Sequence, residues 1–372
     1  MNKFPLFITL FLHCISIDAL AKVVAKGSSE GHDFIVKEQA KLPGRIWGFD
    51  WIDDKTLLLN LRDQGIYRLK VATGKYEKQD SPEFLKNGQG GMLDLQIFKV
   101  KKQRWVYVTY SALSKARNQA NTRLARAELV NHEYGSWQEI FSSNAYSYTG
   151  VHFGSRVVMG KKGYLFMSIG DRGERENGQK LSTHAGSILR LTADGKAPKD
   201  NPFTEKKGAL PEIWTYGHRN PQGLAFDGSG QLWAIEHGPR GGDELNLIGP
   251  GKNYGWPVIS YGKEYSSDRK VGQGTHKKGM EQPKKVYVPS IAPCGMTFYE
   301  GKLFPKWKGH LFAGALAKTH VNHLVIKNKL VLREHRLLKN LGERIRLARI
   351  GPKGRIWLAT DSGRLLAMEP KP

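Results

Sequence analysis

Short segments in which apolar and polar residues alternate recur along the whole chain. They are bounded by turns rich in glycine, of which the chain has 42. A period of two residues is typical of strands, whereas signals of helical periodicity are scarce here. The clearest strands are predicted at residues 56–60, 66–71, 105–110, 164–169, 187–191 and 355–359. The pattern therefore predicts an all-β fold.

These segments fall into a loose repeat. Each unit has an inner strand, a turn containing Gly or Asp, a second strand, and a third strand with an Arg or Leu face. The unit occurs six times, at intervals of roughly 45–70 residues. This repeat predicts a six-bladed β-propeller with four-stranded antiparallel blades. An extra strand around residues 34–37 is expected to complete the last blade and close the ring.

Long insertions rich in Gly and Pro interrupt the units at corresponding places, namely residues 171–186, 236–257 and 261–290. Their placement, together with the repetition, favours a propeller over a β-sandwich. Long loops over one end of a rigid ring are where a functional site is expected. The sequence shows no linker, so residues 22–372 are predicted to form a single propeller domain.

The first 21 residues have the features of a secretory signal peptide. Lys3 precedes an apolar run over residues 4–17, and residues 19–21 form an Ala-x-Ala cleavage site. The apolar run is too short to span a membrane comfortably. We therefore expect residues 1–21 to be removed and the mature protein to be periplasmic and not membrane-spanning.

A formal net charge of +24 raises the question of nucleic-acid binding. The Lys and Arg residues are spread along the chain, with no basic arm and no interleaved aromatic platform. The composition therefore indicates a basic surface, and no nucleic-acid partner is expected. Removal of the signal leaves a single cysteine, Cys294, which cannot form an intrachain disulfide. A chain of this length can bury a core without one.

A histidine and an aspartate flank two neighbouring predicted strands. Residues 151–156, VHFGSR, lead into the first strand, and Asp171 follows the second. Antiparallel strands joined by a short turn bring residues at this spacing together. A carboxylate against one nitrogen of His152 would fix its tautomer and raise its basicity, which makes His152 a candidate general base. The alternative is a polar residue with a structural role at a blade edge.

The predicted turn at residues 217–223, GHRNPQG, holds three polar side chains. Arg219 supplies a fixed fork of donors suited to carboxylate or quinone oxygens. Asn220 supplies both a donor and an acceptor, and His218 is expected to pack or to hydrogen-bond. In the alternative interpretation, Arg219 and Asn220 only tie the turn together.

A loop over residues 236–256 combines glycines and a proline with two acids. Irregular backbone around Gly238 and Pro239 presents carbonyl oxygens, and Asp243 and Glu244 add carboxylates. Calcium takes these two kinds of oxygen together, although the spacing is not that of an EF-hand. The alternative is a solvated acidic turn.

Three cations are expected on one rim of the ring. Lys318 follows a predicted strand, and Arg344 and Arg346 stand two apart in another, so these two are expected to point the same way. Together they imply an anionic ligand. Ordinary surface cations of a basic protein are the alternative.

Six segments, in order and over nearly the whole mature chain, resemble the soluble quinoprotein sugar dehydrogenases, and the bacterial aldose sugar dehydrogenases most closely. GHRNPQG followed by GPRGGDE is the most specific part. The segments are VHFGSR, IGDRG, GHRNPQG, EHGPRGGDELNLI, GKNYGWP and ERIR. The resemblance implies a six-bladed propeller that binds pyrroloquinoline quinone (PQQ) and calcium.

The resemblance also implies a reaction and a set of residue roles. An aldose is oxidised at its anomeric carbon to the lactone, hydride passes to PQQ, and electrons pass to an external acceptor. His152 is the implied base, Asp171 orients it, and Gln89 and Tyr265 are the implied sugar contacts. The implied PQQ contacts are Arg219, which also acts in catalysis, Asn220, Lys318, Arg344 and Arg346. The implied calcium ligands are the carbonyls of Gly238 and Pro239 for an ion that also binds PQQ, and Glu244 and the Tyr254 carbonyl for a second, structural ion.

The chain departs from the soluble glucose dehydrogenases in two ways. They have an Asp directly before the catalytic His, where this chain has Val151, and this chain is shorter. Both differences favour a broad aldose range over strict glucose specificity. Two alternatives belong to other classes: a calcium-dependent lactonase-type hydrolase, and a non-catalytic propeller that binds glycans or a protein. The cluster of Lys and Arg has no role in lactone hydrolysis.

Overall fold

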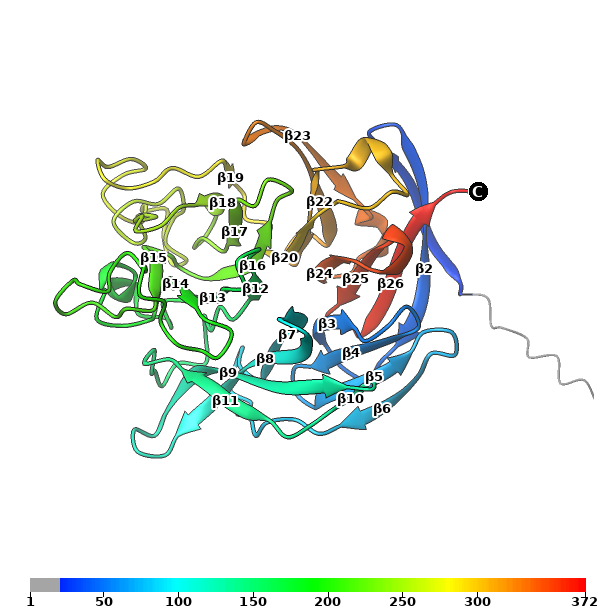
Figure 1. Ribbon diagram of the computed structural model, residues 1–372. Coiled ribbons are helices and arrows are strands. Elements are labelled where there is room, and N and C mark those ends of the chain that lie inside the picture. Colours follow the sequence, from blue (N-terminus) through cyan, green and yellow to red (C-terminus); the bar gives the residue numbers. More distant parts are fainter. Residues whose placement is uncertain (1–20) are drawn as a thin grey trace, which may run out of the picture.

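The computed structural model describes residues 21–372, and the predicted signal peptide lies outside them except for Ala21. Six blades surround a central axis, each with its strands stacked outward (Figure 1). The helices in the described residues are four short 3-10 turns, η1 (Arg175–Gln179), η2 (Pro305–Trp307), η3 (Lys339–Leu341) and η4 (Pro352–Gly354). Within this part of the chain no helix is long and apolar enough to cross a membrane. The predicted six-bladed propeller is confirmed.

The strands of each blade follow one another from the axis outward. The first blade contains β3 (Ile46–Trp51), β4 (Thr56–Leu61), β5 (Gly65–Lys70) and β6 (Lys75–Gln79). The second contains β7 (Met92–Val100), β8 (Gln103–Ser114), β9 (Gln119–Val130), β10 (Glu133–Tyr134) and β11 (Gln138–Ser142). The third contains β12 (Val157–Met159), β13 (Leu165–Ile169), β14 (Ser187–Leu191) and β15 (Ile213–Tyr216). The fourth blade contains β16 (Pro221–Phe226), β17 (Leu232–Glu236), β18 (Asp243–Ile248) and β19 (Lys285–Tyr287). The fifth contains β20 (Pro293–Phe298), β21 (Leu311–Ala315), β22 (His320–Lys327) and β23 (Leu330–Leu337). The sixth contains β24 (Ile345–Ile350), β25 (Ile356–Thr360), β26 (Arg364–Pro370), β2 (His32–Lys41) and β1 (Val23–Ser29).

Strand β2 closes the ring by pairing antiparallel with β26, near the other end of the chain. Phe34 lies opposite Pro370 and Lys41 opposite Arg364, so the pairing runs along the whole of β26. The extra strand expected around residues 34–37 is therefore confirmed. Two details differ from the predicted four-stranded blades: β1 adds a fifth strand to the sixth blade, and two short strands share the outer position of the second.

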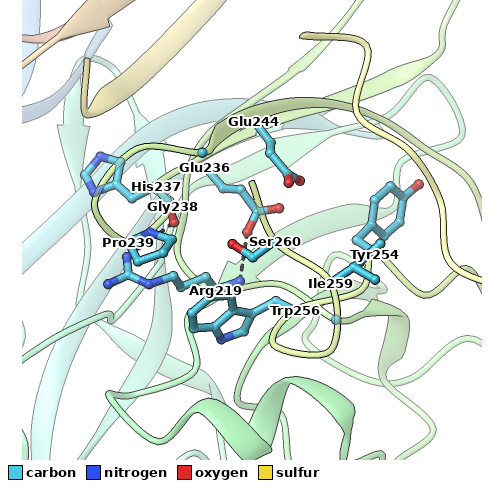
Figure 2. A pocket seen from close by; sticks show the side chains of 12 residues that line it. Arg219, Glu236, His237, Gly238, Pro239, Glu244, Tyr254, Trp256, Ile259 and Ser260 are labelled. Atoms are coloured by element: carbon cyan, nitrogen blue, oxygen red, sulfur yellow. Dashed lines mark hydrogen bonds between the residues drawn. The ribbon is translucent and has the colours of Figure 1, made fainter. Parts of the chain in front are cut away.

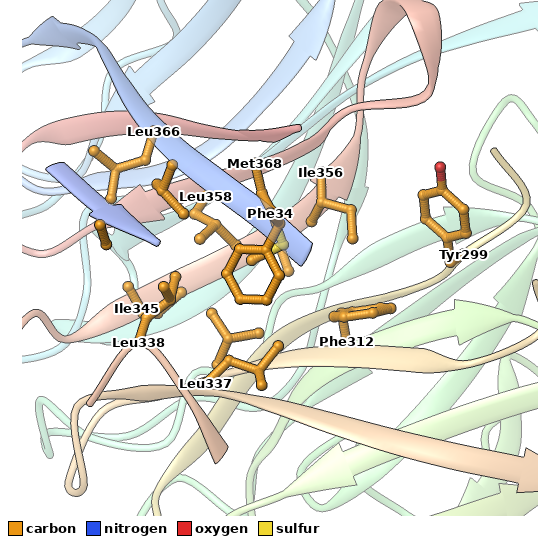
Figure 3. Packing of buried hydrophobic residues seen from close by; sticks show 14 of the residues in the cluster. Phe34, Tyr299, Phe312, Leu337, Leu338, Ile345, Ile356, Leu358, Leu366 and Met368 are labelled. Carbon is orange, nitrogen blue, oxygen red and sulfur yellow. The ribbon is translucent and has the colours of Figure 1, made fainter. Parts of the chain in front are cut away.

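The hydrophobic core lies between neighbouring blades. In β4, Leu57, Leu58 and Leu59 are all completely buried, because blades on either side cover both faces of the sheet. A continuous apolar run is therefore compatible with a strand here. Figure 3 shows one interblade layer, built from the fifth blade and the sixth blade, with Phe34, Phe312, Ile356 and Met368 among its members.

One buried arginine contacts all five of the other blades at the axis. Arg156 lies directly before β12 in the third blade and is 3% exposed. Its guanidinium forms an ion pair with Asp94 of the second blade, with Nη1 2.8 Å from Oδ1. It also donates to carbonyl oxygens of the first, fourth and sixth blades and contacts a sulfur of the fifth, the partners being Trp47, Gln222, Arg346 and Cys294. The inner strands are thereby joined at one level of the axis.

The close approach of β20 to β24 beside this arginine requires a glycine. Gly295 pairs in parallel with Leu347. A Cβ atom at residue 295 would lie 2.5 Å from the Leu347 side chain and 3.0 Å from Arg156 Nη2. The neighbouring Cys294 is a buried free thiol, and Arg346 Nη1 lies 3.5 Å from its sulfur.

Replacing Arg156 by Gln should destabilise the fold by about 3–5 kcal/mol, because the carboxylate of Asp94 would stay buried without its charged partner. Urea unfolding followed by tryptophan fluorescence measures this loss. The matched control is Lys252→Gln, which breaks an exposed ion pair with Glu281 and should change stability little. Equal losses in the two variants would contradict the role given to the axial ion pair.

Candidate active site

The predicted site residues gather at the end of the axis where the inner strands begin. Gln89 precedes β7, His152 precedes β12, Arg219 precedes β16, and Arg346 lies at the start of β24. Because the repeat unit runs in the same sense in every blade, these strand starts lie at one end of the ring. The predicted insertions contribute to the same end, since Asp171 contacts His152 and Tyr265 contacts Arg219.

His152 and Asp171 form a direct pair, with Nδ1 2.6 Å from Oδ1. Asp171 is only 1% exposed and also accepts hydrogen bonds from Gly173 N–H and the Trp256 indole N–H, each at 2.8 Å. Burial alone would raise the pKa of Asp171, but the hydrogen bond and charge of His152, the charge of Arg219 and the Gly173 N–H keep that pKa below its ordinary value. Asp171 is therefore ionised at neutral pH. Its acceptance of a bond from Nδ1 leaves Nε2 of neutral His152 with the lone pair.

The backbone of His152 is left-handed, with φ at 54°. Such values are uncommon in residues other than Gly and persist only where the surroundings fix them. His152 N–H donates to Gln89 Oε1 at 3.0 Å, and Gln89 N–H donates to the Gly150 carbonyl at 2.6 Å. Gln89 is itself exposed. The structure thus brings the predicted base and a predicted sugar contact together.

Arg219 lies beside the second predicted sugar contact. Its guanidinium donates to the His237 carbonyl at 3.3 Å and to Tyr265 Oη at 3.4 Å, and lies 5.4 Å from the ring centre of Trp256. Tyr265 is 65% exposed. Arg219 therefore stands between the buried indole and an open aromatic side chain.

The amide of Asn220 is fixed toward the loop that carries His152. Asn220 is 2% exposed, and its Oδ1 accepts hydrogen bonds from Gly154 N–H at 3.2 Å and from Gln222 Nε2 at 3.1 Å. The turn before β16 and the loop before β12 are thereby held together.

His218 has a structural role, as expected. It is completely buried, with Nδ1 2.8 Å from Glu236 Oε1 and Nε2 2.9 Å from Thr215 Oγ1. Its ring stacks on that of Tyr254, with the ring centres 4.7 Å apart. Both ring nitrogens are occupied, so His152 is the better candidate for the base.

Three guanidinium groups surround the single carboxylate of Asp361. Arg344 Nε lies 3.0 Å from Oδ2, Arg346 Nε 2.8 Å from Oδ1, and Arg45 Nε 3.4 Å from Oδ1. Burial alone would raise the pKa of Asp361, but the arginines lower it. The expectation that Arg344 and Arg346 point the same way is confirmed, although Arg344 lies just before β24. The cluster has an excess of positive charge.

Lys318 extends this cationic region, and the neutral ring of His237 lies beside it. Lys318 is exposed, and no ion pair to it is found within residues 21–372. It lies two residues after Leu316, whose carbonyl accepts a hydrogen bond from Arg344 at 3.0 Å. Burial, with the charges of Arg219 and Arg346, lowers the pKa of His237 to about 3. Arg219 and Arg346 both lie close enough to His237 for their charges to lower its pKa. Cations of the fourth and sixth blades therefore lie near each other at the axis.

A small cavity beside Arg219 brings together the four predicted calcium ligands. The cavity has a volume of about 20 Å³, which suits one water molecule or a small ion. Figure 2 shows the carboxylates of Glu236 and Glu244 in this space. Among the other lining residues are the predicted ligands Gly238, Pro239 and Tyr254.

Glu236 and Glu244 bring like charges together at this cavity. They lie directly opposite each other on β17 and β18, an arrangement that is unfavourable when both are ionised. Burial and the charge of Glu236 raise the pKa of Glu244 to about 8. The described residues hold no group of three or more His, Cys, Asp or Glu side chains suited to a metal. A cation here would therefore need carbonyl oxygens as well as Glu244.

Asp243, which the sequence pattern grouped with Glu244, does not face a cation site. It accepts hydrogen bonds from the backbone and from one hydroxyl, the donors being Gly238 N–H, Ile291 N–H, Ala292 N–H and Ser290 Oγ. These bonds fix the loop before β20 against the hairpin between β17 and β18. The expectation of two ligand acids at this loop is therefore wrong for Asp243.

Residues 42–367, most of the chain, match the Glucose / Sorbosone dehydrogenase family. The chain belongs to this family. It is 38% identical over 327 residues to Aldose sugar dehydrogenase YliI of Escherichia coli (strain K12), covering 86% of this chain and 88% of that protein. It is 30% identical over 274 residues to Quinoprotein glucose dehydrogenase B of Acinetobacter calcoaceticus, covering 65% of this chain and 56% of that protein. The apo-form crystal structure of the soluble aldose sugar dehydrogenase of Escherichia coli matches with a TM-score of 0.86 and 35% identity, over 90% of this chain and 99% of that one.

Membership of the glucose/sorbosone dehydrogenase family confirms the predicted class, an oxidoreductase of sugars. The lactonase-type hydrolase and the non-catalytic propeller are the less favoured alternatives. Glu236, Asp361 and Arg45 are not among the residues predicted from the sequence. Glu236 had a usable signal, because counting across the hairpin that joins β17 to β18 pairs it with Glu244. Arg45 and Asp361 had none, since they lie far apart in the sequence.

Proposed function

We propose that this family member oxidises aldoses at the anomeric carbon to the lactone, using PQQ and calcium, and passes the electrons to an external acceptor. The observation that carries the proposal is the His152–Asp171 pair at the same end of the axis as the converging cations and the carboxylate-lined cavity. The relatives named above as an aldose sugar dehydrogenase and a quinoprotein support the substrate and the cofactor. We also propose that residues 1–21 direct export to the periplasm.

The cationic cluster has the chemistry that a quinone bearing carboxylates needs. Around Asp361, the arginines supply more positive charge than that residue neutralises, and Lys318 adds an exposed ammonium. Arg344, Arg346 and Lys318 would bind the carboxylates of PQQ. Arg219 and Asn220 would hold its quinone oxygens. When bound, PQQ supplies the electrophilic carbon that accepts hydride.

His152 acts as the base in this proposal. Its Nδ1 is engaged by Asp171, so Nε2 is free to take the proton from the hydroxyl on the anomeric carbon. The buried carboxylate of Asp171 stabilises the imidazolium that forms. Gln89 and Tyr265, both exposed, would contact the sugar. Their open position favours a broad range of aldoses.

The cavity beside Arg219, which suits one ion, is the proposed location of the structural calcium, and the proposed ligands of the calcium that contacts PQQ also lie at its edge. The carbonyls of Gly238 and Pro239 would hold the ion that also contacts PQQ, and Glu244 and the Tyr254 carbonyl would hold the structural ion. A divalent cation would offset the repulsion between Glu244 and Glu236. We therefore propose that calcium binding affects Glu236 as well as the four proposed ligands.

Reconstitution tests the function directly. Purified protein supplied with PQQ and calcium should reduce an acceptor dye when aldoses are added. His152→Ala should still bind PQQ by calorimetric titration but lose about 10²–10⁴-fold in kcat, the usual contribution of a general base. The absence of sugar-dependent dye bleaching under any condition would sink the proposal. Full turnover by His152→Ala would remove His152 as the base.

Calcium should raise the melting temperature, and by more at pH 8 than at pH 5. Without a cation the pKa of Glu244 rises from 4.5 in the unfolded chain to about 8. Stability from the bound proton is therefore fully present below pH 4.5 and lost as the pH rises through about 8. Calcium competes with that proton, so its effect grows as the carboxyl ionises. Differential scanning fluorimetry with EDTA or calcium measures this.

In the same assay Glu244→Gln should flatten both the pH dependence and the calcium response. The control is Glu281→Gln, since Glu281 pairs with Lys252 on the exposed surface. A calcium response that survives in Glu244→Gln would contradict this ligand.

Lys318→Ala should weaken PQQ binding about tenfold, because one charge-assisted contact to a carboxylate is lost. Lys329→Ala is the matched control, since Lys329 is an equally exposed lysine beyond the opposite end of β22. Calorimetric titration at two salt concentrations should give a smaller salt dependence for Lys318→Ala only. Identical affinities in the two variants would remove Lys318 from the site.

A further inference from the structure

The buried carboxylate of Asp171 has its two oxygens in different surroundings. Oδ1 is shared by His152 Nδ1 at 2.6 Å and Gly173 N–H at 2.8 Å. Oδ2 accepts the indole N–H of Trp256 at 2.8 Å. A buried carboxylate oxygen without a donor is costly, so the neutral indole completes the solvation of this ion.

Trp256 is itself held in place by two other segments. Its backbone N–H donates to the Gly217 carbonyl at 2.9 Å, in the turn that carries Arg219, and its carbonyl accepts a hydrogen bond from Gln179 Nε2 at 2.7 Å. The ring is 6% exposed and lies beside Arg219 at the edge of the cavity (Figure 2). The indole N–H therefore has little freedom to turn away from Asp171.

The titratable and charged groups around the His152–Asp171 pair come from several segments. His237, in the loop after β17, lies near His152 and is neutral, because its pKa is lowered to about 3. His152 faces Asp171 from the loop before β12, and Arg219 from the turn before β16. Arg172 and Arg175 lie in its own turn and in η1, together with Glu174, whose charge acts on Arg172. Arg175 is itself paired with Glu264, with Nη2 2.6 Å from Oε2, so His152 and Arg219 are the groups whose charge favours the ionised carboxylate. Trp256 differs from all of them because it donates a hydrogen bond without adding charge.

We infer that Trp256 is a positioning residue that sets the proton affinity of the His152–Asp171 pair. Its N–H holds Asp171 ionised and turned toward Nδ1, so that His152 stays neutral, with Nε2 available, down to a lower pH. The inference rests on the proposed function only in taking His152 as the base.

The direction of the effect follows from charge. The pair carries one net negative charge when His152 is neutral and none after it takes up a proton. A hydrogen-bond donor to the carboxylate stabilises the negative state more than the neutral one. Removing the donor should therefore raise the pKa at which the pair takes up a proton, and reduce the fraction of active base at a given pH.

The test is Trp256→Phe, which removes the N–H and keeps an aromatic ring. In the protein without PQQ, NMR titration of the His152 ring should show the apparent pKa raised by roughly one unit. In the reconstituted enzyme, the acid limb of the kcat/KM profile should move to higher pH by the same amount. The plateau at high pH should stay close to that of the original protein.

The matched control is Trp233→Phe. Trp233 is completely buried and, like Trp256, donates its indole N–H to an aspartate, here Asp227 Oδ2 at 2.9 Å. It should lose stability without any change in the titration of His152 or in the rate profile. A shift of equal size in this control would overturn the specific role of Trp256.

A second variant covers the case in which Trp256→Phe does not fold. Site-specific replacement of Trp256 by 3-benzothienylalanine exchanges N–H for sulfur with almost no change in shape. An unchanged apparent pKa of His152 in a folded variant would overturn the inference. A raised pKa without PQQ but an unmoved acid limb would support the inference about the pair and contradict His152 as the base.

Discussion

The buried ion pair between Arg156 and Asp94 is the interaction on which the rest of the propeller depends. A guanidinium group in the interior loses several kcal/mol of hydration, and this is offset only when its donors all find acceptors. Arg156 meets that condition by reaching atoms of the five other blades. The spacing of the inner strands is therefore limited to one at which Arg156 reaches all of its acceptors. Because the site residues lie at the starts of these strands, their geometry follows from the same constraint.

The site holds charges that the protein alone leaves unbalanced. Three guanidinium groups share Asp361, and two carboxylates face one cavity. A ligand of opposite charge that binds only the folded state stabilises that state. The two regions adjoin, since Arg219 lines the cavity and acts with Arg346 on His237. The site therefore favours the binding of an anion and a cation next to each other.

Local patterns predicted the features that depend on short sequence distances or on repetition. The six units, the closing strand and the His152–Asp171 pair all follow from strand periodicity or from neighbouring strands. The pairs that sequence missed cross between blades: Arg156 with Asp94, Arg45 with Asp361, and Trp256 with Asp171. Their partners meet only after the ring has closed, so no local spacing marks them. Asp243 was misjudged for a related reason, because its donors come from the loop before β20.

The pairing of β2 with β26 also fixes the order in which the molecule can be assembled. β2 is made before β3 and β26 after β25, so the sixth blade stays incomplete until the five other blades have been made. The carbonyl of Arg346, one of the acceptors of Arg156, arrives with that blade. A chain that stops before Arg344 would contain His152 and Asp171 and yet lack Arg344, Arg346 and Asp361. The anion-binding cluster is therefore complete only in a chain that can also close the ring.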